Sequence, residues 1–220
     1  MNRLRMVFCG TPQFAVPSLE KFISLPEFEI TGVFTQPDRP RGRGHEVTFS
    51  PVKEVALAAK LPVHQPAKMR APEVEELLRQ LAPDVIVIIA YGQIIPARLL
   101  NIPRLGWINL HASLLPKYRG AAPIAWAIAN GETRTGNTTM RIDAGMDTGE
   151  MLLQQELSIG SDETAPDLSV RLATGRAEAE LARAIEVFAD RAHVGAVTPS
   201  ERRYRQRLAR VGVQLLSHRP

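Results

Sequence analysis

The chain has 220 residues, 45% of them hydrophobic and 23% charged, with a formal net charge of +4. This length and composition indicate a folded globular protein, either one domain or one domain with an appendage. The longest apolar run, Val85–Ala90, is far shorter than the ~20 residues that cross a membrane, and the single cysteine, Cys9, excludes an internal disulfide framework and a Cys/His zinc site. We therefore expect a monomeric cytoplasmic protein with no metal and no membrane association.

The positive charge is concentrated near the end of the chain. Residues 201–220 contain six arginines against one acid, Glu201, a net charge of +5, so the other 200 residues sum to −1. A basic tail is more often a solvated segment than a specific reader of RNA. The overall charge therefore does not by itself indicate nucleic-acid binding.

The first part of the chain alternates between apolar strands and amphipathic helices. Strands are predicted at Arg5–Cys9, at Glu29–Thr35 and near Val63, and helices at Ala15–Ser24, Pro51–Ala59 and Ala71–Gln80. Gln36–Pro51 is polar and rich in glycine, proline and arginine, which predicts a long surface loop. Loops of this length are more often functional or mobile than accidental, so this one is a candidate binding segment.

The alternation continues through the rest of the chain. Strands are predicted at Asp84–Ala90, Gly106–His111, Thr135–Ile142 and Met151–Leu157, and helices at Ala122–Ala129 and Ala165–Asp190, the last with a bend near Gly175. This order predicts an α/β fold with a Rossmann-like open, mostly parallel twisted sheet and helices on both faces. In such sheets, ligands bind at the carboxyl ends of the strands, where Tyr91-Gly92 begins a loop.

Three polar residues could together catalyse the transfer of an acyl group to an amine. Asn109 and His111 lie on the same side of one predicted strand, near its carboxyl end, and Asp147 lies in a glycine-containing loop. Taken singly, the histidine could be structural and the aspartate a turn former. Together they supply what acyl transfer requires, namely donors for the tetrahedral oxyanion and a base for the amine proton.

Two motifs make a family resemblance specific. Asn109–Gly120 (NLHASLLPKYRG) followed by Asp143–Gly149 (DAGMDTG) resembles the signature of the formyltransferases that use 10-formyltetrahydrofolate as co-substrate. The resemblance implies the formyltransferase fold, with Asn109 and His111 holding the formyl oxygen and Asp147 supporting His111 and proton removal. It also implies a folate pocket, which would be lined by Ser113, Leu114, Leu115, Pro116, Tyr91 and Gly92.

Other segments indicate the acceptor substrate. Gly10–Pro17, Gly32–Gly44, Ser50–Lys53 and Gly120–Ile124 resemble the formyltransferases that act on initiator methionyl-tRNA. In those enzymes the Arg/Gly loop contacts the tRNA acceptor end, so the candidate phosphate contacts are Arg39, Arg41 and Arg43. Three alternatives stay open: a merely solvated basic loop, a formyltransferase for an amino sugar or other small amine, and a folate-binding core with little turnover.

The resemblance also predicts the domain organisation. It covers residues 4–172 and becomes weak from Thr174 onward. We therefore expect a catalytic domain at residues 1–190 and an atypical Arg-rich tail at residues 191–220, in place of the family's linker and C-terminal tRNA-binding barrel. The tail has no evident strand pattern, and the change in composition suggests a truncated or frameshifted product.

Overall fold

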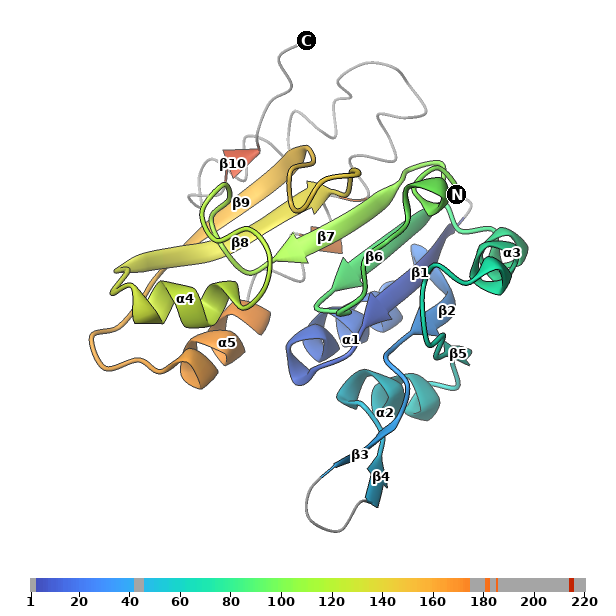
Figure 1. The fold of residues 1–220 in the computed structure, drawn as a ribbon, viewed down its shortest axis with the longest axis horizontal. Coiled ribbons are helices and arrows are strands. Elements are labelled where there is room, and N and C mark those ends of the chain that lie inside the picture. Colours follow the sequence, from blue (N-terminus) through green and yellow to red (C-terminus); the bar gives the residue numbers. More distant parts are fainter. Residues whose placement is uncertain (1–2, 42–45, 175–180, 183–184, 186–213, 216–220) are drawn as a thin grey trace. The chain divides into compact units, whose positions relative to one another are not determined.

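The structure is a computed structural model, and it describes residues 3–41, 46–174, 181, 182, 185, 214 and 215. The chain divides into two compact units, residues 1–108 and 109–220, which are described separately below (Figure 1). The predicted catalytic domain therefore contains more than one unit. Its boundary at residue 190 lies outside the described residues and stays a prediction.

A parallel sheet forms the centre of the first unit. Its strands are β1 (Leu4–Gly10), β2 (Phe28–Phe34), β5 (Val63–His64) and β6 (Val85–Ile89), in the order β6-β1-β2-β5. All residues of β6 are buried. Because successive side chains of a strand point to opposite faces, both faces of the sheet are covered here. Cys9 is buried in β1.

Helices cover both faces of this sheet. They are α1 (Val16–Ser24), α2 (Pro51–Ala58) and α3 (Pro72–Leu81), together with the short helices η1 (Gln13–Ala15) and η2 (Ala97–Leu99). The ring of Phe22 in α1 lies 6.4 Å from that of Phe8, which is paired in register with Val33. The adjacent Gly32 faces the other way, because a Cβ built on it would meet Leu81 of α3 at 3.1 Å. The predicted fold class is therefore confirmed.

One prediction in this unit is wrong in part. The segment expected to be a loop contains β3 (Arg39–Arg41) and β4 (Glu46–Thr48), an antiparallel pair with Arg39 opposite Thr48. These strands are short and carry proline and charged residues, so they lack the apolar alternation that identifies a strand in sequence. The hairpin extends beside α2 (Figure 1).

The second unit contains four strands that neighbour one another in a sheet. Its strands are β7 (Trp107–His111, which begins in the first unit), β8 (Arg134–Arg141), β9 (Met151–Ser158) and β10 (Gln214–Leu215), in the order β7-β8-β9-β10. β9 runs antiparallel to both β8 and β10. The helices are α4 (Pro123–Ala129) and α5 (Ala165–Ala173), which pack together. No helix in the described ranges is long and apolar enough to cross a membrane.

The C-terminal part departs from prediction at two points. Helix α5 ends at Ala173 and Thr174 takes an extended conformation, so a continuous helix over Ala165–Asp190 is wrong, and the interruption lies next to Gly175, where the bend was predicted. Leu181, Ala182 and Ile185 are again helical and buried. The tail at residues 191–220 was expected to have no evident strand, yet it contains β10, which pairs with β9. Two residues with backbone pairing leave no periodic pattern in a sequence, which explains why β10 was missed.

Candidate functional site

His111 and Asp147 lie next to each other in the second unit. His111 ends β7, its side chain is 8% exposed, and its Nδ1 lies 3.6 Å from Oδ2 of Asp147. Its Nε2 lies 2.8 Å from the backbone carbonyl oxygen of Tyr118. Because a carbonyl oxygen only accepts hydrogen bonds, Nε2 carries a hydrogen, and Nδ1 is the nitrogen that can gain or lose a proton. The structure thus directs Nδ1 of His111 at a carboxylate.

The Asp147 carboxylate is held by the backbone. The amide of Gly120 donates to its Oδ2 at 2.7 Å, and the side chain is 19% exposed. Asp147 has a φ of +50°, a left-handed conformation that aspartate adopts more readily than most residues. Within the same loop Asp143 accepts hydrogen bonds from the Gly145 amide at 2.9 Å and the Thr148 hydroxyl at 2.8 Å. The loop therefore presents Asp147 through its own internal bonds.

The turn after β7 sets the orientation of His111. Tyr118, Gly120 and Ala122 all have positive φ angles, which gives this turn a strongly bent path. The Tyr118 hydroxyl donates to Glu132 at 2.7 Å, and Lys117 donates to the same carboxylate at 2.9 Å. The Lys117 and Tyr118 hydrogen bonds hold the pKa of the Glu132 carboxyl below its usual value, so Glu132 stays charged and anchors the turn.

Asn109, the third residue predicted for catalysis, lies on the same strand as His111. It lies two residues before His111 in β7 and is half-buried. Its side-chain amide has no hydrogen-bond partner among the residues that the structure describes. Amide groups that are partly removed from water are normally hydrogen-bonded, so an unused donor at this position is available to a ligand.

The Ser113–Pro116 segment is a turn anchored on β8. The fully buried Ser113 hydroxyl donates to the carbonyl of Lys117 at 2.7 Å, while the Leu115 amide donates to Thr138 at 3.1 Å. The Leu115–Pro116 peptide bond is cis. Leu114 is half-buried and Pro116 is exposed, whereas Leu115 is buried. Contact with folate through this turn stays a prediction, and Leu114 and Pro116 are its most accessible side chains.

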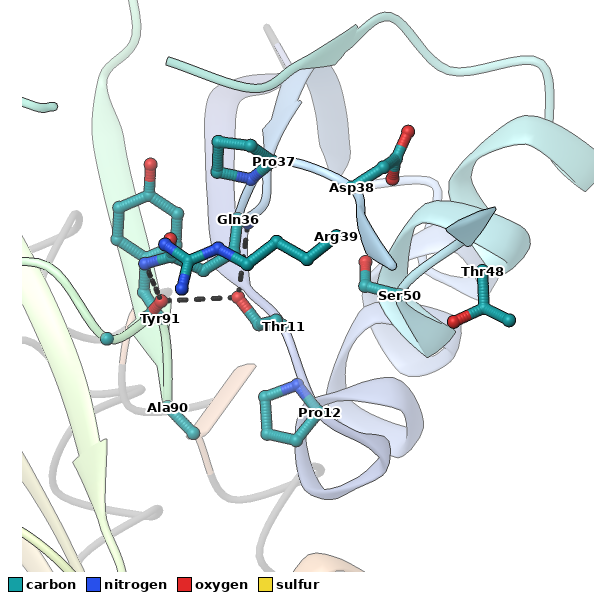
Figure 2. Close-up of a pocket in the computed structure, with 11 residues that line it drawn as sticks. Thr11, Pro12, Gln36, Pro37, Asp38, Arg39, Thr48, Ser50, Ala90 and Tyr91 are labelled. Atoms are coloured by element: carbon teal, nitrogen blue, oxygen red, sulfur yellow. Dashed lines mark hydrogen bonds between the residues drawn. The ribbon is translucent and has the colours of Figure 1, made fainter. Parts of the chain in front are cut away.

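A cavity of about 390 Å³ lies in the first unit, beside the hairpin (Figure 2). It is lined by Thr11, Pro12, Gln36, Pro37, Asp38, Arg39, Thr48, Ser50, Ala90, Tyr91 and Gly92. The Tyr91 carbonyl accepts hydrogen bonds from Thr11 at 3.2 Å and from Gln36 at 3.0 Å. Burial raises the pKa of the Tyr91 phenol far above its usual value, and its hydroxyl points to the sulfur of Met69 at 3.4 Å. The phenol is therefore part of the core.

This cavity brings together residues that the sequence assigned to different substrates. Tyr91 and Gly92 were expected to contact folate and Arg39 to contact tRNA, yet all three line the same space. The Arg39 side chain is exposed and extends over the cavity (Figure 2). Arg41 ends strand β3. Arg43 lies outside the described residues, and its role stays a prediction.

Several supporting residues could not be recognised from the sequence. Tyr118 and Gly120 act through backbone atoms, although both lie inside the motif that identified the site. Lys53, Asp38 and Gln65 form a network under the hairpin that no spacing rule indicates, because Gln65 comes from a distant segment. A residue that acts through its backbone or through a distant partner leaves no signal in residue type.

Comparison with known proteins supports one family over most of the chain. Residues 4–185 match the family described as formyl transferase. A methionyl-tRNA formyltransferase from Solibacter usitatus is 57% identical over 170 residues, covering 77% of this chain and 54% of the relative. One from Geobacter metallireducens is 52% identical over 198 residues, covering 90% of this chain and 62% of the relative. The chain thus spans little more than half the length of these relatives.

Solved structures show the same fold at lower sequence identity. A phosphoribosylglycinamide formyltransferase from Anaplasma phagocytophilum superposes with a TM-score of 0.70 at 18% identity, covering 86% of this chain and 88% of the other. A formyltetrahydrofolate deformylase from Pseudomonas syringae gives 0.69 at 21% identity, covering 86% and 63%. At such identities the likeness supports the architecture alone.

Proposed function

Because this chain belongs to the formyl transferase family, we propose that it transfers the formyl group of 10-formyltetrahydrofolate to the methionine amino group of initiator methionyl-tRNA. The observation that carries the chemistry is the His111 Nδ1 facing the Asp147 carboxylate, two residues along β7 from the half-buried Asn109 amide. The choice of acceptor rests on relatives that bear the name methionyl-tRNA formyltransferase and are 49–57% identical to this chain. We also propose that the protein acts as a monomer in the cytoplasm.

The proposed reaction needs no covalent enzyme intermediate. The amine nitrogen attacks the formyl carbon, the carbonyl oxygen becomes an oxyanion, and the bond between the formyl carbon and N10 of the folate then breaks. The Asn109 amide donates a hydrogen bond to the oxyanion. Formation of this oxyanion is the step at which fixed donors lower the barrier most. The proton lost by the amine passes to the His111–Asp147 pair, and a proton is returned to the departing N10.

The geometry refines the role of His111. Its Nε2–H is engaged by the Tyr118 carbonyl, which leaves Nδ1 as the atom that exchanges a proton with the reacting groups. A proton on Nδ1 would be stabilised by the Asp147 carboxylate, whose Oδ2 also accepts from Gly120. We therefore assign His111 to proton exchange and oxyanion support through Nδ1, and Asp147 to holding that proton.

The acceptor is proposed to enter over the hairpin and cavity of the first unit. The exposed Arg39 guanidinium can form charge-assisted hydrogen bonds with phosphate oxygens. Arg41 and Arg43 add positive charge along the same segment, and the glycines beside them allow the backbone to follow a nucleic acid. The folate is proposed to contact Leu114 and Pro116 of the turn after β7, together with the Tyr91-Gly92 segment.

Formyl transfer by the purified chain tests this function. The initial rate is measured with 10-formyltetrahydrofolate and a concentration series of charged initiator methionyl-tRNA, and with small amines, including an amino sugar, as competing acceptors. We expect saturable transfer to methionyl-tRNA, and a kcat about 10²- to 10⁴-fold lower with the variant Asp147→Asn. The values of kcat and KM are determined separately, because weaker contacts with the tRNA would raise KM without changing the rate of the chemical step. Transfer to the amino sugar alone would overturn the proposed acceptor.

A further inference from the structure

A partly buried ion pair lies under the β3–β4 hairpin. The ammonium of Lys53 in α2 donates to Oδ2 of Asp38, which directly precedes β3. Gln65, just after β5, accepts from the same ammonium at 2.8 Å and donates to the other Asp38 oxygen at 2.9 Å. Gln65 also donates to the carbonyl of Gln36 at 2.9 Å. Three separate segments therefore meet at the start of the hairpin.

The other end of the hairpin is fixed by neighbouring contacts. Phe49, which follows β4, places its ring 4.0 Å from the Lys53 ammonium. The Ser50 hydroxyl accepts from the Lys53 amide at 3.1 Å as the cap of α2, and it bonds Thr35 at 2.7 Å. The Lys53 side chain thus contacts Asp38 before the hairpin and Phe49 after it. Its loss would free the first end and remove the ring contact at the second, where Ser50 keeps its bonds to Thr35 and to the Lys53 backbone amide.

The burial of this pair distinguishes it from the other ion pairs. The Lys53 and Asp38 side chains are 12% and 20% exposed. In seven other lysine or arginine pairs with acids, the side chain of the basic partner is at least 41% exposed. Removing such charges from water costs free energy, so a partly buried ion pair adds little to stability. Its main effect is to fix one geometry. The Lys53 charge is also neutralised by Asp38, which makes it a poor phosphate contact.

We propose that Lys53, Asp38 and Gln65 form a clasp that positions the β3–β4 hairpin for acceptor binding. Asp38 and Arg39 are adjacent in sequence and both line the cavity, so the clasp fixes the backbone from which Arg39 extends. The three clasp residues are positioning residues, since they act through Arg39 and the hairpin. This inference rests on the proposed function, and it adds how the hairpin that carries Arg39 is held in place.

The test compares Lys53→Met with Lys60→Met. Both changes remove one lysine charge at or next to α2, but Lys60 is exposed and follows the helix. Three quantities are measured: kcat for methionyl-tRNA, KM for methionyl-tRNA, and the rate at which trypsin cuts after Arg41 and Arg43. Arg39 is followed by proline, so cleavage there does not interfere. The tryptic rate needs no catalysis, so it reports on the clasp even if the proposed function fails.

We expect Lys53→Met to raise both the tryptic rate and the KM for methionyl-tRNA by about tenfold, with kcat nearly unchanged, while Lys60→Met behaves as wild type. Lys53→Arg should recover much of the loss, because it restores the ion pair. If Lys53→Met fails to fold, as judged by thermal unfolding, Asp38→Asn and Gln65→Leu take its place. An unchanged tryptic rate in the folded variants would overturn the clasp. A faster tryptic rate with unchanged KM would overturn its link to acceptor binding.

Discussion

The two units each contain a carboxylate beside a basic side chain, but the two pairs are built differently. Around Lys53 and Asp38 the hydrogen-bonding groups are used: the ammonium contacts Asp38, Gln65 and the Phe49 ring, and both Asp38 oxygens accept. Nδ1 of His111 and Oδ2 of Asp147 lie 3.6 Å apart, beyond hydrogen-bond length, with His111 at the end of β7 and Asp147 in a loop at a positive φ angle.

The difference distinguishes a residue pair that positions a segment from a residue pair that can take part in a reaction. A pair with satisfied partners has one stable arrangement, which suits the base of a binding segment. A pair with space between an imidazole nitrogen and a carboxylate can exchange a proton with a reacting substrate. On the proposed function, the first unit serves recognition and the second the chemical step, so substitutions in each should affect different kinetic quantities.

The largest effect is expected from Asp147→Asn. The amide can still accept from the Gly120 backbone, but it can no longer stabilise a proton on His111, so kcat should fall by about 10²- to 10⁴-fold. The KM for methionyl-tRNA should change little. Steady-state rates at saturating tRNA measure this, and Asp162→Asn, at an exposed position in the same unit, is the control. A drop confined to KM would place Asp147 in recognition.

Gly149→Ala should disturb the loop that presents Asp147. A Cβ at Gly149 would stand 2.0 Å from the carbonyl oxygen of Arg141, so the backbone must shift. We expect a loss of about 1–3 kcal/mol in unfolding free energy, measured by urea denaturation, together with a lower kcat. In Gly160→Ala the new Cβ meets only an ordinary contact at 3.5 Å, and this variant should resemble wild type. Equal stability of the two variants would contradict the geometry.

Arg39→Ala should act in the opposite way, on binding alone. Loss of one phosphate contact should raise the KM for methionyl-tRNA several-fold and lower by about 1 the slope of log KM against log salt concentration, while kcat stays constant. The measurement is a KM series at several potassium chloride concentrations. Binding of 10-formyltetrahydrofolate, followed by calorimetry without tRNA, tests the alternative that Arg39 serves the folate.

The smallest effect is a pH dependence of stability. The hydrogen bond from Lys53 holds the pKa of the Asp38 carboxyl below its usual value. The stabilisation is therefore present above the ordinary aspartate pKa of about 3.9, and it is lost as the pH falls through the lowered value. The unfolding free-energy difference between wild type and Asp38→Asn should stay constant from about pH 7 to pH 5 and shrink in stronger acid. Urea denaturation across this range measures it, and a gap that closes above about pH 5 would contradict the assignment.

Much of the fold could be predicted because its signals are local. The run Val85–Ile89 is apolar throughout and forms the fully buried β6. Pro51 and Pro72 begin helices, where the absence of an amide hydrogen has no cost. β3, β4 and β10 were missed because backbone pairing defines them, and pairing depends on a partner strand rather than on residue type.

Residue types at fixed spacing were enough to predict the family, the alternation of strands and helices, and the catalytic candidates. Which nitrogen of His111 faces Asp147 could be learned from the three-dimensional arrangement alone, since the carbonyl of Tyr118 engages the other nitrogen. That arrangement also decided that Gln65 joins Lys53 and Asp38 beneath the hairpin. Distances between residues remote in the chain are set by the packing of whole elements, and no local pattern records them.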